Sequence, residues 1–202
     1  NFEGIVISLT LKVGDKVSEG DLILILESLS SESKIKEETK IEKQSETIVE
    51  IKQTTEQIST HQKKITDIYS ISSSEKGVGN KAGSNKTPIG IHRIKSKIGD
   101  NVPINSRFIG RKLTGEIVDI ISDTSKGDLD IISTRIMWLS GEEFGINKGN
   151  GIDSYERYIY IHGTNEEGRI GIPSSHGCVR MKNKDVIDLY RKVEVGTLVL
   201  IK

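Results

Sequence analysis

Several residue types are scarce in this chain, and each scarcity excludes something. Among its 202 residues Cys178 is the single cysteine, so no disulfide can form within the chain. Charge is balanced at 29 basic and 29 acidic residues, which excludes the strong overall positive field that attracts nucleic acid. The sequence has no run of 18 or more apolar residues, and we therefore predict no membrane-spanning helix.

The chain also lacks a recognisable beginning. It starts at Asn1 rather than Met, and no positively charged start followed by an apolar run is visible. We expect the natural start to lie upstream, so the missing signal pattern excludes no compartment. Hydrophobic residues make up 34% of the sequence, which is low for a chain that is globular throughout. The shortfall is uneven, and it divides the chain into three segments.

Residues 1–27 have the pattern of two short strands joined by turns. The runs 5–9 (IVISL) and 22–26 (LILIL) are apolar, and glycine–aspartate pairs between them signal turns. This stretch resembles one half of a lipoyl/biotinyl carrier domain. Such a domain works through one lysine at a hairpin tip, and here that lysine lies upstream or is replaced near Ser30 by serine. We therefore expect no lipoyl or biotinyl group, and interpret the segment as a partial β-hairpin without a function of its own.

Residues 28–63 differ sharply from the first segment. Ser, Glu, Lys, Thr and Gln dominate and no aromatic residue occurs, so little surface is available to offset the entropy of ordering. A thin amphipathic helix is the alternative, supported by isoleucines at positions 41, 48, 51 and 58. We predict a polar linker that is disordered or thinly helical.

Residues 64–202 are the predicted folded body. Apolar and β-branched runs recur between glycine-rich turns, which is typical of a mainly β domain. One helix is predicted over 183–192, with Asn183 as its N-cap and with Val186, Leu189 and Tyr190 on one face. The predicted strands cover residues 65–71, 117–121, 131–139, 158–162 and 198–201.

The lone cysteine lies close to two histidines. His162 ends an apolar run, and a loop then leads to His176, Gly177 and Cys178. A thiol attacks as its thiolate, which is the minor form at neutral pH, so it needs a base, and imidazole supplies one. Because Gly177 has no side chain, a substrate carbonyl can approach the backbone there. The N–H groups of Gly177 and Cys178 are therefore candidates for an oxyanion hole.

These motifs resemble those of the YkuD family of L,D-transpeptidases. The family carries His-Gly, a loop, and Ser/Thr-His-Gly-Cys followed by a small apolar residue and Arg or Asn. Here the corresponding stretches are 162–164 (HGT) and 175–181 (SHGCVRM), and 87–90 (TPIG) matches the upstream T-P-x-G turn. The resemblance covers about residues 66–202. It implies a β-sandwich-like catalytic domain with one or two short helices.

The resemblance also implies roles for individual residues. Cys178 would be the nucleophile, His162 the general base, and His176 a second imidazole lining the site. Arg180 would lie beside the nucleophile, either orienting the loop or pairing with a substrate carboxylate. The implied substrate-binding residues are Arg180, Ser175, Gly163 and Thr164. Because glycine follows His162, a backbone carbonyl must orient the imidazole, and the sequence does not identify it.

The implied reaction is acyl transfer on peptidoglycan stem peptides. Cys178 would form a thioester with the meso-diamino acid of a tetrapeptide stem and expel the terminal D-alanine. A second stem, a lipoprotein lysine or water would then accept the acyl group. No metal and no organic cofactor is needed, and the family implies a location in the periplasm or cell envelope.

Several alternatives remain open at this stage. Cys178 could be a buried structural residue, or form a zinc site with His162 and His176, although three ligands at such close spacing are unusual. The protein could be an L,D-carboxypeptidase that uses water, or a peptidoglycan-binding module without activity. It could also be a carrier subunit defined by its first segment, against which the missing lysine counts.

Overall fold

The computed structural model describes residues 5–9, 23–29 and 63–202, and these are mainly β with one α-helix. The predicted fold class is confirmed. The elements are β1 (Ile5–Leu9), β2 (Ile23–Leu29), β3 (Lys63–Ser72), β4 (Gly90–Ile98), β5 (Ser106–Ile109), β6 (Lys112–Ile117), β7 (Ile132–Gly141), β8 (Tyr160–Gly163), a 3-10 turn η1 (Glu167–Arg169), β9 (Val179–Met181), α2 (Asn183–Lys192) and β10 (Leu198–Ile201).

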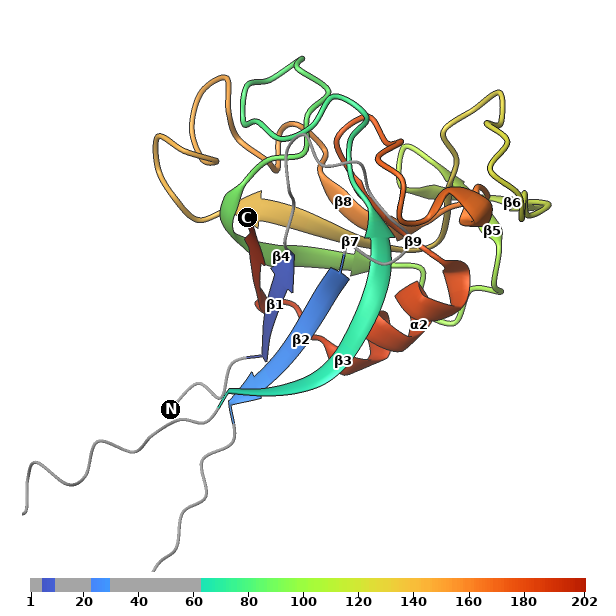
Figure 1. Ribbon diagram of the computed structural model, residues 1–202, viewed down its shortest axis with the longest axis horizontal. Helices are drawn as coiled ribbons and strands as arrows, with labels where there is room; N and C mark the ends of the chain where they lie inside the picture. Colours follow the sequence, from blue (N-terminus) through green and yellow to red (C-terminus); the bar gives the residue numbers. More distant parts are fainter. Residues whose placement is uncertain (1–4, 10–22, 30–62) are drawn as a thin grey trace, which may run out of the picture.

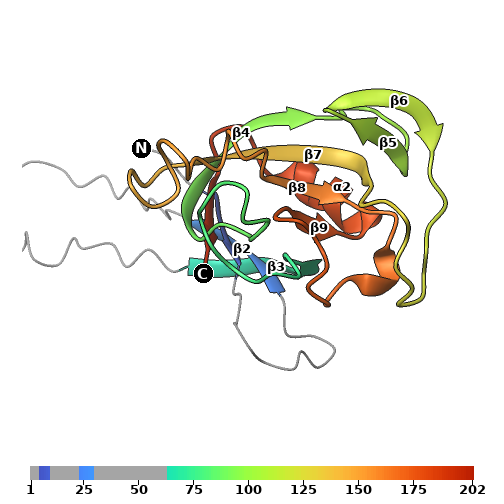
Figure 2. The same ribbon diagram turned by 90° about the horizontal axis from the view of Figure 1, so that it is seen from above.

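The strands form a single ten-stranded sheet that curls on itself (Figure 1). Its order is β4-β10-β1-β2-β3-β9-β8-β7-β5-β6, and β4 also pairs with β7, so the strands from β4 to β7 in this order close into a ring. The sandwich-like fold expected from the sequence has two facing layers, and here both layers are formed by opposite sides of this one curled sheet. Beyond the ring, β5 and β6 continue past β7 as an arm, which Figure 2 shows from above.

Two apolar clusters lie on opposite faces of β7 and β8. Met137 of β7 and Ile161 of β8 belong to the main core, which α2 completes with Val186 and Leu189 among others. On the other face, Ile136 of β7 and Tyr160 of β8 pack with Phe108 of β5. Because side chains alternate along a strand, His162 of β8 projects to the same face as Tyr160. This second face carries the candidate site.

The structure corrects one predicted strand. Residues 117–121 were expected to form a strand, but β6 ends at Ile117, and the chain continues irregularly. The backbone bonds to loops instead of to a strand: the Val118 N–H donates to the Asn105 carbonyl at 2.9 Å and the Ile121 N–H to the Asn165 carbonyl at 2.8 Å. Only Val118 of this run is buried, and the apolar run therefore marked an irregular segment rather than a strand. The other predicted strands are present as β3, β7, β8 and β10.

The predicted helix spans the expected residues, but its N-terminus is arranged differently. Lys182 occupies the N-cap position without a side-chain hydrogen bond, and Asn183 is the first helical residue. Glu167 of η1 takes over the capping role. Its Oε1 accepts from both the backbone N–H and the side-chain Nδ2 of Asn183, each at 2.7 Å. A carboxylate at a helix N-terminus is also favoured by the helix dipole.

Parts of the first two predicted segments lie outside the described residues. The two expected strands of the first segment are present as β1 and β2, which pair antiparallel with each other. β1 also pairs in parallel with β10, and β2 pairs with β3, so both belong to the same sheet as the folded body. The proposed linker over 28–63 lies almost wholly outside the described residues, and the division at these boundaries stays a prediction. In the described part of the chain, no helix is long and apolar enough to cross a membrane.

Candidate active site

The parallel pairing of β8 with β9 brings the histidine and cysteine motifs together. Ile161 pairs with Val179, His162 with Arg180, and Gly163 with Met181. Ile161 and Val179 face the main core, so His162 and Arg180 project to the opposite face. Cys178 lies one residue before β9 and packs against the cluster of Tyr160 and Phe108 on that face. The register therefore places the thiol and the His162 imidazole on one face of adjacent strands.

The backbone on either side of Ile159 holds the Cys178 thiol. Sγ donates to the Tyr158 carbonyl at 3.5 Å and accepts from the Tyr160 N–H at 3.4 Å. Tyr158 has φ of 57°, in the left-handed region that a residue with a side chain rarely adopts. This strained conformation directs its carbonyl at the thiol. Burial raises the pKa of Cys178 to about 12, so the thiol is protonated at rest.

His162 is buried and held in one orientation. Its Nδ1 lies 2.7 Å from the carbonyl oxygen of Gly163, which identifies the backbone carbonyl that the sequence could not assign. Nδ1 donates in this pairing, and Nε2 is then left as the basic nitrogen. Burial lowers the pKa of His162, against smaller opposing effects of Asp130 and the Gly163 carbonyl. The imidazole is therefore neutral at physiological pH and able to accept a proton.

Gly163 is also required by packing. A Cβ at this position would lie 2.5 Å from Asn183 Oδ1 and 2.8 Å from the Ser133 carbonyl oxygen. No side chain fits there without displacing the backbone of β7. The glycine after the histidine thus allows β8 to lie against β7 and the start of α2.

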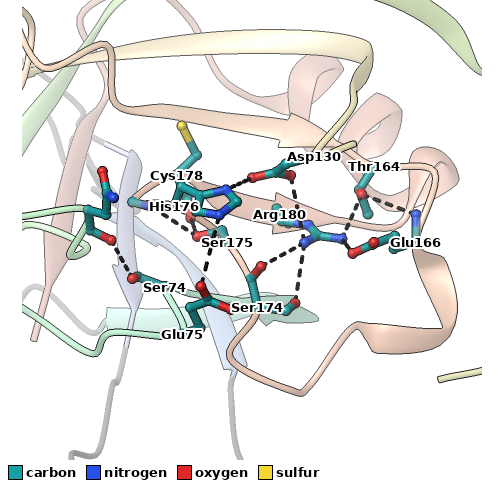
Figure 3. A network of polar contacts seen from close by, with 12 residues as sticks. Ser74, Glu75, Asp130, Thr164, Glu166, Ser174, Ser175, His176, Cys178 and Arg180 are labelled. Carbon is teal, nitrogen blue, oxygen red and sulfur yellow. Dashed lines mark hydrogen bonds and ion pairs between the residues drawn. The ribbon is translucent and has the colours of Figure 1, made fainter. Parts of the chain in front are cut away.

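His176 lies between two carboxylates, as Figure 3 shows. Its Nδ1 is 2.9 Å from Asp130 Oδ2, and its Nε2 is 3.9 Å from Glu75 Oε1. Asp130 comes from the loop before β7, and Glu75 from the segment after β3. In the same view the sulfur of Cys178 points away from this network. His176 thus borders the candidate site two residues before Cys178, on a half-exposed position.

The Arg180 side chain is buried, and polar groups surround its guanidinium. It is 1% exposed, and Glu166 Oε2 accepts from its Nη2 at 2.5 Å. Nη2 also donates to Thr164 Oγ1 at 2.9 Å, and Nη1 to the Ser174 carbonyl at 3.1 Å (Figure 3). Asp130 Oδ1 lies 3.7 Å from Nη1. These contacts favour the loop-orienting role of the two considered for Arg180, because they leave it no route to a substrate carboxylate.

The remaining predicted binding residues are also interior. Thr164 and Ser175 are fully buried, and both use their hydroxyl groups within the loop. Ser175 Oγ donates to the Cys178 carbonyl at 2.6 Å and accepts from the Gly177 N–H at 3.2 Å. Of the two backbone groups predicted to form an oxyanion hole, the Gly177 N–H is therefore already engaged. The N–H of Cys178 is the stronger candidate of the pair.

The T-P-x-G turn fastens one side of the site. Thr87 is buried and its Oγ1 accepts from the Ser74 N–H at 2.9 Å. Arg157 holds the same segment from the other side, donating to the carbonyls of Gly79, Asn80 and Lys86 at 2.6–3.1 Å. A cavity of about 410 Å³ lies here, with Asn85, Asp153, Arg157 and His176 in its lining. Its polar walls could take the peptide part of a substrate.

On the side of the thiol away from His176, four aromatic residues form what we call the aromatic wall: Trp138, Tyr155, Tyr158 and Tyr160. Trp138 of β7 stacks on Tyr155 with ring centroids 4.0 Å apart, and meets Tyr158 and Tyr160 at 5.7 Å. Trp138 packs against the second apolar cluster while staying partly exposed. Tyr158 is 53% exposed. This wall is continuous with the backbone that holds Cys178.

Sequence reasoning missed several residues of this site. Asp130 and Glu75 contact His176, and Arg111 lies on the aromatic wall, but none of them stands in a recognisable motif. Glu166 is the buried partner of Arg180 and also stands in no motif. Only three-dimensional pairing brings these groups together.

Fold and site together define a class: a mainly β domain whose single thiol and a buried imidazole project to one face of two adjacent parallel strands. The chain belongs to the YkuD family of L,D-transpeptidase catalytic domains, which matches residues 46–201. The match begins inside the segment predicted to be a linker and continues through β10.

Named relatives agree with this family. YkuD of Bacillus subtilis (strain 168), whose name assigns it to the L,D-transpeptidases, is 56% identical over 87 residues, which are 41% of this chain and 47% of that protein. YbiS of Escherichia coli (strain K12), also named as an L,D-transpeptidase, is 54% identical over 43 residues, or 21% of this chain and 14% of that protein. The chain thus spans less than half the length of these curated relatives.

Solved structures of L,D-transpeptidases are also similar. The structure of LdtMt1 in complex with imipenem has a TM-score of 0.47 and 10% identity, covering 99% of this chain and 59% of that one. An L,D-transpeptidase from Mycobacterium smegmatis gives a TM-score of 0.45 and 9% identity, over 99% and 59% of the two chains.

Proposed function

We propose that the protein is a cysteine-dependent L,D-transpeptidase that acts on peptidoglycan tetrapeptide stems, with Cys178 as nucleophile and His162 as general base. The observation that carries the proposal is the shared face of β8 and β9, to which the thiol and a neutral, oriented imidazole both project. Membership of the YkuD family supplies the class of substrate.

The reaction would proceed in two steps. Nε2 of His162 takes the thiol proton as Sγ attacks the carbonyl carbon of the meso-diamino acid. The tetrahedral intermediate collapses with cleavage of the C–N bond, and His162 returns the proton to the departing amine of D-alanine. An amine of a second stem or of a lipoprotein then attacks the thioester while His162 accepts its proton, and the C–S bond breaks as that proton returns to the Cys178 sulfur.

Several features support this assignment over a structural cysteine. The Tyr160 N–H points at Sγ and would stabilise negative charge as the thiolate forms. The thiol and imidazole are both neutral at rest, so charge develops only with the attack, where hydrogen-bond donors lower the barrier most. A polar cavity next to His176 gives the stem peptide a place to bind.

Membership of the family supports a proposal for the acceptor and the place of action. We propose that the protein works in the periplasm or cell envelope, where stem peptides occur, with a second stem or a lipoprotein as acceptor. The carboxypeptidase alternative shares the first step and differs only in taking water, and a binding module without activity would use neither step.

The test is intact-protein mass spectrometry after incubation with a carbapenem and, separately, with a purified tetrapeptide stem. We expect one covalent adduct per chain in the wild type and none in Cys178→Ala, whose unfolding temperature should be unchanged. A crosslinked product identifies transfer, and a shortened stem alone identifies hydrolysis. A well-folded wild-type protein that forms no adduct would contradict the proposal.

A further inference from the structure

The tip of the β5–β6 arm brings an arginine to the aromatic wall. Ile109 pairs with Lys112, so Gly110 and Arg111 form a two-residue hairpin loop. Both have positive φ, 53° and 67°, as a turn of this length requires. For Arg111 this conformation is strained, since its side chain crowds the backbone. The turn fixes where the arginine points.

The Arg111 side chain lies flat against three aromatic residues. Its guanidinium carbon is 4.4 Å from the Trp138 ring centroid and 5.0 Å from that of Tyr158. One N–H, on Nη1, donates to the Tyr160 hydroxyl at 3.0 Å. Cation–π contacts and this bond hold the guanidinium in place before any ligand arrives.

Arg111 is also next to the nucleophile. Two of the residues that it touches, Tyr158 and Tyr160, are the ones whose backbone groups contact the Cys178 sulfur. The guanidinium and the thiol are therefore attached to the same three-residue stretch of chain. A ligand group bound by Arg111 would therefore contact the same stretch of chain that holds the thiol.

The charge of Arg111 is not neutralised by any carboxylate in the part of the chain that the structure describes. The other arginines around the site are engaged: Arg107 with Glu116, Arg157 with three carbonyls, and Arg180 with Glu166. Arg111 has one hydrogen bond and further N–H donors on an accessible group. An oriented guanidinium with free donors matches the geometry of a carboxylate.

We propose that Arg111 binds a carboxylate of the stem peptide and so selects substrates that carry a free acid beside the scissile bond. This inference rests on the proposed function for the identity of the ligand. Two carboxylates are close enough by covalent structure: that of the terminal D-alanine and that of the meso-diamino acid side chain. Amidation of either one removes its charge and leaves the rest of the stem unchanged.

The experiment measures equilibrium binding in the Cys178→Ala protein, in which no thioester can form. Three tetrapeptide stems are compared: the free acid, one amidated at the terminal D-alanine, and one amidated at the diamino acid. We expect one amidated stem to bind about ten- to a hundredfold more weakly than the free acid, as loss of a charged hydrogen bond predicts. The stem that weakens identifies the carboxylate.

Arg111→Gln in the same background should erase that difference by weakening only the stems that keep the carboxylate. Arg107→Gln is the matched control, because it removes the same charge from the same arm but from an arginine already paired with Glu116. It should leave the preference intact. Arg111→Lys keeps the charge without the planar donor pair, and should retain part of the preference.

Two results would overturn the proposal. One is equal binding of all three stems by the protein with Arg111. The other is an equal loss of binding for all three stems in Arg111→Gln, which would show that the arginine only fixes the position of the β5–β6 arm. Failure of the proposed function gives a different pattern: stems bind with the carboxylate preference, yet the wild-type protein forms no adduct on Cys178.

Discussion

At the scale of single residues, burial keeps both the proposed nucleophile and the proposed base neutral in the free protein. Cys178 holds its proton because desolvation raises its pKa, and His162 lacks one because desolvation lowers its pKa. An exposed cysteine–histidine pair would be freer to form an ion pair and to react with any electrophile. Here the N–H of Tyr160 favours the thiolate only at the sulfur itself. The arrangement limits reactivity to ligands that fit the site.

The pH dependence of acylation tests this view. His162 must be neutral to accept the thiol proton, and burial lowers its pKa below the ordinary histidine value of about 6.5. The acylation rate of Cys178 by a carbapenem should therefore stay high as the pH falls through 6.5, and decline only below it. Stopped-flow or timed mass spectrometry across pH 4–8 measures the profile. An acidic limb centred above about 6.5 would contradict the assignment of His162.

The buried ion pair of Arg180 and Glu166 should contribute strongly to the stability of the protein. Glu166→Gln removes the nearer of the two carboxylates beside the buried Arg180 charge and leaves Asp130 Oδ1 at 3.7 Å. Breaking a buried pair typically costs about 3–5 kcal/mol in the free energy of unfolding, and the remaining Asp130 puts this variant at the lower end of that range. Glu116→Gln is the control, because it removes a carboxylate that pairs with Arg107 at the surface and should cost about 1 kcal/mol or less. Urea denaturation measures both. Equal losses in the two variants would contradict a structural role for the buried pair.

At the scale of elements, the T-P-x-G turn and the 142–158 loop are interlocked through Gly90. This residue has φ of 102°, and a Cβ on it would lie 2.2 Å from Glu143 Oε2 and 2.7 Å from Asn147 Nδ2. Glu143 needs that space because its carboxylate accepts the Ile91 N–H. Asn147 donates to the carbonyls of Ile89 and Ile91 at 3.1 and 3.0 Å. The turn is therefore tied to the loop that forms one wall of the polar cavity.

Gly90→Ala should therefore destabilise the protein and weaken stem binding. Gly83→Ala is the control, because Gly83 also has a positive φ, 72°, but open space around its missing Cβ. Both variants carry the backbone strain of roughly 1 kcal/mol, and Gly90→Ala adds the clash. We expect a loss larger than that of Gly83→Ala by about 1–3 kcal/mol, measured by denaturation. Similar losses would show that the turn and the loop are not interlocked.

Elements with a strong local pattern were predictable from the sequence. The helix 183–192 and the strands that became β7 and β10 carry apolar residues at the right spacing, and the contiguous SHGC motif identified Cys178 and His176. β4 was missed because charged side chains interrupt its run, GIHRIKSKI, and only one face of it is buried. Local periodicity reports on one strand face at a time, and a half-exposed strand gives a weak signal.

The rest of the site could not be predicted, because it depends on pairing between distant segments. Asp130 reaches His176 across 46 positions of sequence, and Arg111 reaches Tyr160 across 49. Neither lies in a periodic run, and each is placed by a turn or loop whose direction the sheet determines. The carbonyl that orients His162 was foreseen in kind, and only the structure assigned it to Gly163.

At the scale of the whole molecule, a second buried histidine links stability to pH. His92 is fully buried, with Nδ1 3.0 Å from the Gly90 carbonyl and Nε2 3.0 Å from Ser154 Oγ. Burial lowers its pKa to about 4, with smaller opposing effects of the Gly90 carbonyl and Glu143. The unfolded chain binds a proton at His92 near pH 6.5, whereas the folded protein does so only near pH 4. Stability is therefore present above pH 6.5 and is lost as the pH falls from 6.5 towards 4.

The expected loss from His92 is up to about 3 kcal/mol over that window. Urea denaturation of the wild type and of His92→Gln at pH 7.5, 6, 5 and 4.5 measures it. The variant should be less stable at high pH but should lose less stability on acidification. His162, whose pKa burial also lowers, adds a loss of the same sign in both proteins and sets the remaining slope. Parallel curves for the two proteins would contradict the role of His92.

The closed ring described earlier also governs how this protein can aggregate. A strand at the border of a sheet offers unpaired amides and carbonyls to any other chain that is extended. Because β4 and β7 join, the described strands of the ring hide these groups, and β6 at the end of the arm is left as the border. All of β6 is exposed, and it carries Leu113 and Ile117 beside charged Lys112 and Glu116. Self-assembly into fibrils or swapped dimers should therefore begin at β6, and its two charged residues, Lys112 and Glu116, are the barrier against it.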